Sequence, residues 1–227
     1  MSSTDDHADF KRHEASPFFR EEVRSAVALF GPVVGRRVWD LGCGGGSLVR
    51  HLTLAGARPT GLDVRADALA WGTSGGNGSF VRGRAEALPI RDGSLDGIVA
   101  QHLIEHMEDP GGALREWRRC LGEGGVLVLV TPNRRYPDPS IFSDLTHRRI
   151  YTAEDLRKAV ATAGFVIQEA YTIFPYLRGH TVFGLRHYRL FRKLPGFRRS
   201  GRTLILRARR TGPSDTSRLT PRQSSSM

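Results

Sequence analysis

The chain has 227 residues, enough for one domain with a sizeable core and few for two. Hydrophobic content of 39% and charged content of 25% are typical of globular proteins, and no apolar run approaches the about 20 residues that cross a bilayer. The two cysteines, Cys43 and Cys120, indicate no disulfide framework and the N-terminus does not resemble a secretory signal, so we expect a cytoplasmic protein.

The net charge of +11 is concentrated near the C-terminus. Residues 176–210 contain eleven Arg or Lys and no Asp or Glu, whereas residues 1–175 sum to about −1. Because the basic character does not extend along the chain, nucleic acid is not the partner that we expect.

Taken in chain order, residues 1–15 predict a disordered tail, and Ser16-Pro17 predicts the start of a helix. Short apolar runs then alternate with amphipathic stretches. We predict strands at 37–41, 59–64, 79–82, 95–101 and 125–131, and helices at 47–55, 66–71, 111–121 and 153–163. Residues 72–79 are predicted to be a glycine-rich surface turn, and residues 211–227 a disordered tail.

This alternation predicts a doubly wound α/β fold, in which a mostly parallel sheet has helices on both faces. In such a sheet ligands bind at the carboxyl ends of the strands. Residues that follow the predicted strands are therefore the first candidates for a functional site.

The most informative stretch is a glycine loop after the first predicted strand. Asp40 ends that strand, and Gly42, Cys43 and Gly44 follow it in a G-x-G spacing. Glycine allows positive φ and a close approach of the backbone to a ligand. Asp63 ends the second predicted strand, where a carboxylate can accept hydrogen bonds from ribose hydroxyls.

The two carboxylates favour a cationic nucleoside cofactor over a dinucleotide. Asp40 would repel a pyrophosphate, but it suits the cationic amino group of a methionine moiety. Asp63 alone is shared with dinucleotide enzymes, so the pair is the discriminating feature. A nicotinamide oxidoreductase and a tight glycine turn beside an incidental surface Asp are the less favoured alternatives.

Four consecutive motifs together resemble the class I S-adenosylmethionine-dependent methyltransferases. They are DLGCGGG at 40–46, GLDV at 61–64, GRAEALPIRDGSLDGIVAQHLIEHMEDP at 83–110 and LGEGGVLVLVTPN at 121–133. The small-molecule branch, with its ubiquinone and menaquinone methyltransferases, is the most similar. The resemblance covers about residues 36–170. It implies a domain over 16–210, built on a Rossmann-like sheet of seven strands whose last strand is antiparallel, with the final pair at 165–171 and 202–207.

The resemblance also implies S-adenosylmethionine as cofactor and a set of residues that bind it. The backbone N–H of Ala85 would meet the adenine, although Arg84 stands where the family often has an adenine-binding aspartate. Gln101 ends the fourth predicted strand at the carboxyl edge. The cofactor-binding set is Asp40, Gly42, Cys43, Gly44, Asp63, Val64, Ala85, Glu86 and Gln101.

Histidines follow the fourth and fifth predicted strands, and three interpretations compete for them. In the first, Glu105 and His106 stabilise the loop through hydrogen bonds. In the second, His106 or His147 is the general base that deprotonates a hydroxyl or amine. In the third, Glu105, His106 and His147 bind a divalent metal, similar to the E-x-x-E-H pattern of some ubiquinone and small-RNA methyltransferases. His102 replaces the first glutamate of that pattern, and a histidine-rich set would favour zinc or iron.

The basic segment 176–210 interleaves arginines with aromatic and leucine side chains, most densely at 183–199. It is interpreted as an insertion between the last strands, as a peripheral membrane or lipid contact, or as an RNA-binding element. Aromatic residues around the expected acceptor pocket favour an apolar or ring-bearing acceptor: Tyr136, Phe142, Tyr151, Phe174 and Tyr176.

The sequence thus predicts a methyltransferase that moves a methyl group from S-adenosylmethionine to an O, N or C atom of a small molecule. The sulfonium already activates the methyl group, so catalysis requires alignment and, for some nucleophiles, deprotonation. Glu105, His106 and His147 are the predicted catalytic residues. An RNA methyltransferase and a non-catalytic relative that binds the cofactor are the alternatives.

Overall fold

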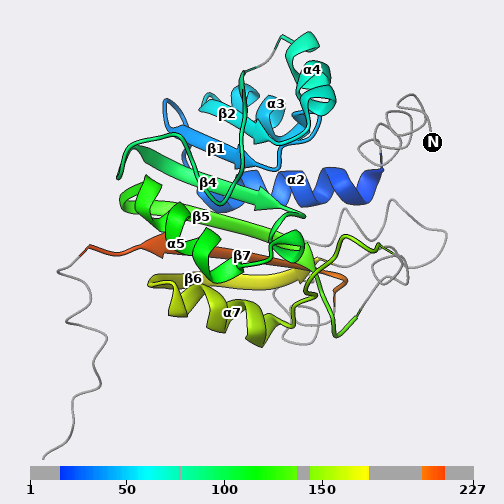
Figure 1. Cartoon of the computed structure of the whole chain (residues 1–227), viewed down its shortest axis with the longest axis vertical. Helices are drawn as coiled ribbons and strands as arrows, with labels where there is room; N and C mark the ends of the chain where they lie inside the picture. Colours follow the sequence, from blue (N-terminus) through cyan, green and yellow to red (C-terminus); the bar gives the residue numbers. More distant parts are fainter. Residues whose placement is uncertain (1–15, 77, 137–143, 174–200, 213–227) are drawn as a thin grey trace, which may run out of the picture.

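A single sheet carries the described part of the chain, with strand order β3-β2-β1-β4-β5-β7-β6 (Figure 1). The computed structural model describes residues 16–76, 78–136, 144–173 and 201–212. The strands are β1 (Arg37–Leu41), β2 (Arg58–Asp63), β3 (Ser79–Arg82), β4 (Leu95–Gln101), β5 (Leu121–Pro132), β6 (Phe165–Ile173) and β7 (Thr203–Arg210). The helices are α2 (Pro17–Phe30), α3 (Ser47–Leu54), α4 (Ala66–Ser74), α5 (Pro110–Cys120) and α7 (Ala153–Thr162), with a 3-10 turn η1 (Ile104–His106).

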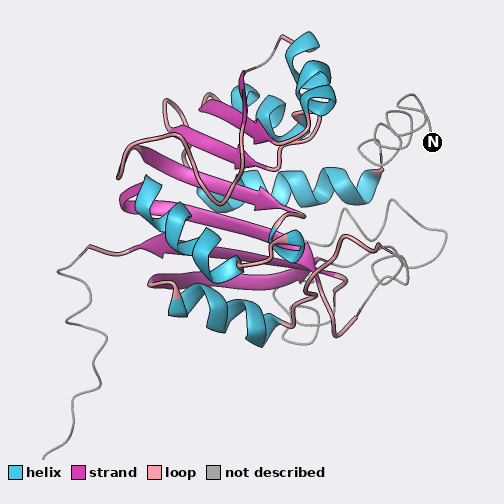
Figure 2. Ribbon diagram, in the orientation of Figure 1, coloured by secondary structure: helices cyan, strands magenta, loops and turns pink. Residues whose placement is uncertain are grey.

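The predicted doubly wound sheet is confirmed. Strands β3, β2, β1, β4 and β5 are parallel to their neighbours, and β7 runs antiparallel to both β5 and β6. Helices cover both faces (Figure 2). One hydrophobic core joins α5 and α7 to the sheet through Trp117 and Leu156, and a second joins α2 and α3 to the opposite face through Val23 and Leu52. Burial of these two apolar faces is the main force that holds the layers together.

Several predicted boundaries were wrong by a few residues. Strand β5 begins at Leu121, four residues before the prediction, and β7 continues to Arg210. Helix α4 extends to Ser74, so the first residues of the glycine-rich stretch 72–79 belong to a helix. Leu204, Leu206 and Ala208 all enter the same core. Pairing of Ala208 and Arg209 with β5, and of Arg210 with Phe165 of β6, extends β7 beyond the prediction.

The first helix begins where the sequence predicts. Ser16 Oγ accepts the N–H of Phe19 at 3.1 Å, and Pro17 occupies the first turn, where its missing N–H costs no hydrogen bond. The predicted tail 1–15 and the stretch 174–200, which includes most of the basic segment, lie outside the described residues. Of the predicted tail 211–227, residues 213–227 also lie outside, whereas residues 211–212 are described and buried, so the prediction of disorder was wrong for these two. Among the described helices, none is both long and apolar enough to cross a membrane.

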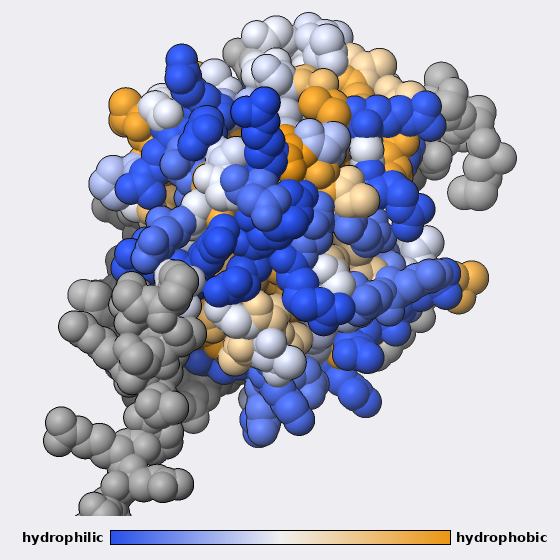
Figure 3. Space-filling view, turned by 60° about the vertical axis from the view of Figure 1, so that its left-hand side comes forward, coloured by the Kyte–Doolittle hydropathy of each residue, from blue (hydrophilic) through white to orange (hydrophobic). Residues whose placement is uncertain are grey.

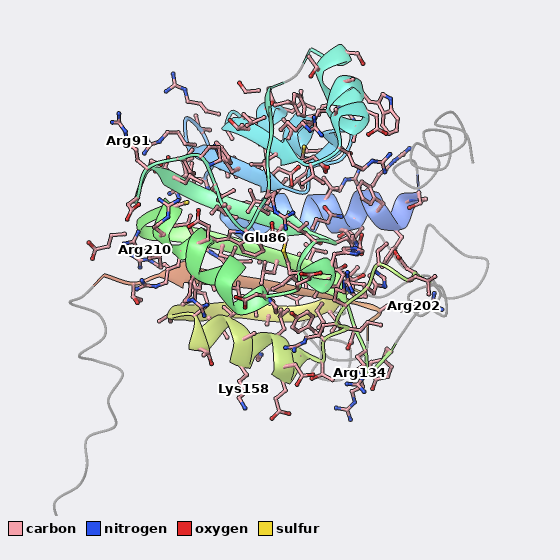
Figure 4. The ribbon with its side chains drawn as sticks, viewed as in Figure 1. Glu86, Arg91, Arg134, Lys158, Arg202 and Arg210 are labelled. Atoms are coloured by element: carbon pink, nitrogen blue, oxygen red, sulfur yellow. The ribbon has the colours of Figure 1, made fainter. Side chains whose placement is uncertain are left out.

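The amino and carboxyl edges of the sheet both carry arginines (Figure 4), with Arg91 and Arg210 at the amino edge and Arg134 and Arg202 at the carboxyl edge. The face turned forward in Figure 3 is mostly hydrophilic, with small hydrophobic patches. At the amino edge, Arg37 pairs with Asp96 at 3.5 Å. The parallel strands β1, β2 and β4 end at the opposite, carboxyl edge, and the predicted site residues follow them there.

Candidate cofactor and acceptor site

The glycine loop at 42–46 leads from β1 into α3 and needs glycine at defined positions. Gly42, Gly44 and Gly46 have φ values of +69°, +50° and +76°, a region that other residues rarely adopt. A Cβ on Gly42 would lie 2.9 Å from the Cδ1 atom of Leu103, so the loop after β4 packs directly on the loop after β1. The Gly42 N–H donates to the carbonyl of Leu62 at 2.8 Å, which joins the loop to the end of β2.

Asp63 lies at the end of β2 and contacts the glycine loop. Its Oδ2 accepts the N–H of Gly44 at 2.9 Å, and its Oδ1 accepts the N–H of Arg65 at the same distance. Each carboxylate oxygen has two acceptor positions, so both can accept one further donor. The two backbone bonds fix the carboxylate in orientation beside the loop, as a ribose-binding residue requires.

Asp40 is a buried carboxyl group, only 3% exposed, near the end of β1, the strand between β2 and β4. Burial, and then the charge of Asp63, raise its pKa well above the usual range. No cationic side chain among the described residues forms an ion pair with it. A cationic amino group brought beside Asp40 would compensate for its lost hydration, so this pair of carboxylates fits the methionine end of S-adenosylmethionine.

The side chain of Cys43 has a packing role. It is 8% exposed. A Cβ atom added to Gly61 would lie 2.7 Å from the Sγ of Cys43, so the two residues pack tightly. Burial raises the pKa of the Cys43 thiol, which is therefore a poor nucleophile. Its predicted role in cofactor binding can involve only the backbone of the loop.

The segment predicted to meet the adenine is held by the α5 helix. The carbonyl of Ala85 accepts the indole N–H of Trp117 at 2.8 Å, which fixes the backbone at this position. Glu86 forms an ion pair with Arg84 at 3.3 Å, so Arg84 is directed at a glutamate. Val64 is 53% exposed at the end of β2 and offers an apolar contact at the same edge.

Two buried glutamates hold His102 immediately after β4. His102 Nε2 lies 3.0 Å from Glu22 on α2, and Nδ1 lies 3.3 Å from Glu105 on η1. Both glutamates are buried, at 1% and 0% exposed, whereas the histidine side chain is 31% exposed. Burial alone would lower the pKa of His102, but the two carboxylates outweigh it and raise the pKa to about 10. His102 is therefore an imidazolium near neutral pH, with no free base to accept a proton.

The two glutamates also bind neighbouring strands. Thr131 on β5 donates its hydroxyl to Glu105 at 3.0 Å, and Thr203 on β7 donates to Glu22 at 2.5 Å. The side-chain amide of Gln101 donates to Glu22 at 3.3 Å, so this predicted cofactor residue is directed towards α2. Glu105 thus accepts a hydrogen bond from β5 and contacts His102 in the arrangement seen.

His106 and His147 lie together, as the sequence predicted, although 41 positions separate them. Their ring centroids are 4.7 Å apart. His106 Nδ1 lies 3.0 Å from the hydroxyl of Thr146. His147 Nε2 lies 3.6 Å from Asp144, which Thr146 holds by two further hydrogen bonds. Unlike His102, neither histidine forms ion pairs with two buried carboxylates of the described ranges, and their predicted role as general base stays a prediction.

Glu105, His106 and His147 also form a candidate metal site. Their ligand atoms all lie within 4.8 Å of one another. Glu105 already accepts a hydrogen bond from the hydroxyl of Thr131 and contacts the ring of His102. In the arrangement seen, Glu105 is thus engaged in hydrogen bonds, and a metal site at these three residues stays a prediction.

The predicted aromatic residues are placed only in part. Tyr151 is 1% exposed, and its hydroxyl has no hydrogen-bond partner among the described residues. Tyr136 is 39% exposed after β5. Phe142, Phe174 and Tyr176 lie outside the described residues.

Glu22 is the site residue that sequence reasoning missed. Glu22, Ala26 and Leu29 are all buried and follow one another at intervals of four and three residues, the spacing of one helix face. A glutamate on an otherwise apolar stripe requires a buried partner. That pattern was the available signal, but the partners are about 80 and 180 positions away.

The fold and the glycine loop define the chain as a doubly wound α/β protein of the Rossmann-like class. Residues 39–129 match the family model described as a methyltransferase domain. This match covers less than half of the chain and indicates a methyltransferase domain, for which S-adenosylmethionine is the cofactor that the sequence predicts.

Curated relatives named as methyltransferases are similar to part of the chain. A ubiquinone biosynthesis O-methyltransferase of Bordetella avium is 31% identical over 57% of this chain and 56% of its own length. A protein of Mycolicibacterium smegmatis, described as a probable S-adenosylmethionine-dependent methyltransferase, is 32% identical over 71% of this chain and 64% of its own. The chain thus spans about half to two thirds of the length of these relatives.

Two solved structures share the fold. The methyltransferase in a complex with the Haloferax volcanii activator Trm112 aligns with a TM-score of 0.71 and 21% identity, over 92% of this chain and 96% of its own. An S-adenosylmethionine-dependent methyltransferase of Mesorhizobium loti aligns with a TM-score of 0.65 and 21% identity, over 82% and 96%.

Proposed function

We propose that the protein transfers a methyl group from S-adenosylmethionine to a small-molecule acceptor, at an oxygen, nitrogen or carbon atom. The observation that carries the proposal is the pair of carboxylates beside the glycine loop, because Asp63 contacts the loop directly and buried Asp40 favours a cation. A hydroxyl oxygen is the favoured acceptor atom, since several relatives are named as ubiquinone biosynthesis O-methyltransferases.

In this proposal the cofactor supplies a methyl group that its sulfonium makes electrophilic. The chain has three tasks: Asp63 orients the ribose, Asp40 faces the amino group, and His106 or His147 takes the proton of the acceptor hydroxyl. A phenol needs such a base less than an aliphatic alcohol does, because its pKa is near 10. Alignment of the hydroxyl with the methyl group supplies the larger part of the rate.

The test is turnover. Purified protein with S-adenosylmethionine is offered a panel of hydroxylated aromatic compounds and, separately, total RNA, and S-adenosylhomocysteine is measured. Methylation of a small phenol or quinol supports the proposal. Methylation of RNA alone would establish the alternative, and cofactor binding with no turnover on either panel would favour a non-catalytic relative.

A further inference from the structure

Helix α2 brings one carboxylate to the carboxyl edge, and the function proposed above gives it no role. Figure 1 shows the N-terminal end of α2 at the same edge where β4 and β5 end. Glu22 in this helix is 1% exposed and contacts His102 and Gln101 of the β4 end, together with Thr203 at the start of β7. A carboxylate so deeply buried is stable only when its oxygens are paired.

His102 adopts a backbone conformation that is uncommon for its residue type. Its φ is +51°, and no other non-glycine residue in the described ranges has a positive φ. Such strain persists only where the surroundings fix it. Here both ring nitrogens face glutamates, and the backbone N–H donates to the carbonyl of Val130 at 2.8 Å.

The turn at His102 places the next side chain against the glycine loop. Leu103 packs on Gly42 so closely that a Cβ there would lie 2.9 Å from Leu103 Cδ1. Gly42 in turn precedes Gly44, whose N–H binds Asp63. A continuous chain of contacts therefore runs from α2 to the loop that would hold the cofactor.

We propose that Glu22 is a positioning residue for the cofactor: it fixes His102 in its left-handed turn, so that Leu103 holds the glycine loop in its binding conformation. This role rests on the proposed function, because it concerns the same cofactor site. Glu22 does not itself touch the cofactor; it acts through His102 and Leu103.

The test measures the affinity for S-adenosylmethionine by calorimetric titration, at a temperature where circular dichroism shows every variant folded. A role in fold stability alone leaves the Kd of the folded protein unchanged. Glu22→Gln keeps the size of the side chain and removes the charge that faces the imidazolium. We expect its Kd to rise about 10-fold, within the usual range of coupling between sites. Glu21→Gln, in the adjacent residue of the same helix, is the matched control and stays within twofold of wild type.

Two further variants test the path of contacts. Leu103→Ala removes the last contact, and we expect its Kd to rise by several fold. His102→Gly removes the ring that contacts the two glutamates, but glycine readily adopts the left-handed backbone conformation. Adding Glu22→Gln to His102→Gly should change the Kd little further, because both act through one path.

Unchanged affinity in Glu22→Gln, or additive effects of Glu22→Gln and His102→Gly, would overturn the role of Glu22 while leaving the cofactor assignment intact. If Glu22→Gln does not fold, Leu103→Ala decides: a Kd equal to wild type overturns the path. Absence of binding by the wild type would instead refute the proposed function itself.

Discussion

Substitution of Gly42 by alanine gives a prediction whose two components can be separated. A side chain at this position adopts φ near +69° and approaches Leu103 Cδ1 to 2.9 Å. The left-handed backbone alone costs roughly 1–2 kcal/mol. The contact adds a displacement of Leu103 or of the loop, and overpacking of this kind costs about 1–3 kcal/mol.

Gly35 is the matched control, because its φ is +72° and a Cβ there would meet nothing within 4 Å. Gly35→Ala should therefore lose only the backbone component of about 1–2 kcal/mol, a fall in Tm of about 2–8 °C. Gly42→Ala should lose about 2–5 kcal/mol, and its Kd for S-adenosylmethionine should rise at least about 10-fold.

Urea unfolding and calorimetric titration measure the two quantities. Gly35→Ala is expected to bind the cofactor like wild type. If Gly42→Ala matched Gly35→Ala in both stability and affinity, the site would not require close packing of Leu103 on the glycine loop, and the reasoning would be refuted.

Three other predictions follow from the site. Asp40→Asn should raise the Tm of the free protein at neutral pH, because the buried carboxyl group with its raised pKa destabilises the fold once it ionises. The same variant should bind the cofactor more weakly. A lower Tm with unchanged affinity would contradict this prediction. His106→Ala or His147→Ala should reduce turnover with an aliphatic alcohol acceptor by about 100-fold or more and leave cofactor affinity intact. Wild-type turnover in both variants would exclude a base at either position. Cys43 and Cys120 should resist alkylation at pH 8 in the native protein and react in denaturant. Burial raises the pKa of both thiols, and that of Cys120 to about 11. Rapid labelling of the native protein would refute their burial.

The sequence was sufficient to predict the sheet and the carboxyl edge at which the candidate residues lie. Short apolar runs bounded by glycine and aspartate identify β1, β2 and β4, and parallel pairing places their carboxyl ends together. Asp40, Gly42 and Asp63 were therefore predictable as neighbours. The stretch at 121–124 contains two glycines and resembles a turn, but the structure includes it in β5, where Leu121 pairs with Leu95 of β4 before a shift in register.

The network around His102 was not predictable, because it depends on partners that are distant in the sequence. His102 was expected at the carboxyl edge. The carboxylate of Glu22 stabilises its charge, and its left-handed backbone conformation belongs to the turn into η1. Gln101 was expected to face the cofactor, whereas its amide donates to α2. Periodicity indicates that Glu22 is buried, yet only the three-dimensional arrangement shows which groups stabilise its charge.

The central claim is that Asp63 and the glycine loop bind S-adenosylmethionine, and calorimetric titration of wild type, Asp63→Ala and Asp67→Ala tests it most directly. Asp67 is an exposed aspartate four residues away, paired with Arg65, so its loss should leave the affinity unchanged. The account predicts micromolar binding by wild type and an about 100-fold weaker Kd for Asp63→Ala, the loss of two hydrogen bonds to a charged group. Wild-type affinity in Asp63→Ala, or no binding by the folded wild type, would contradict it.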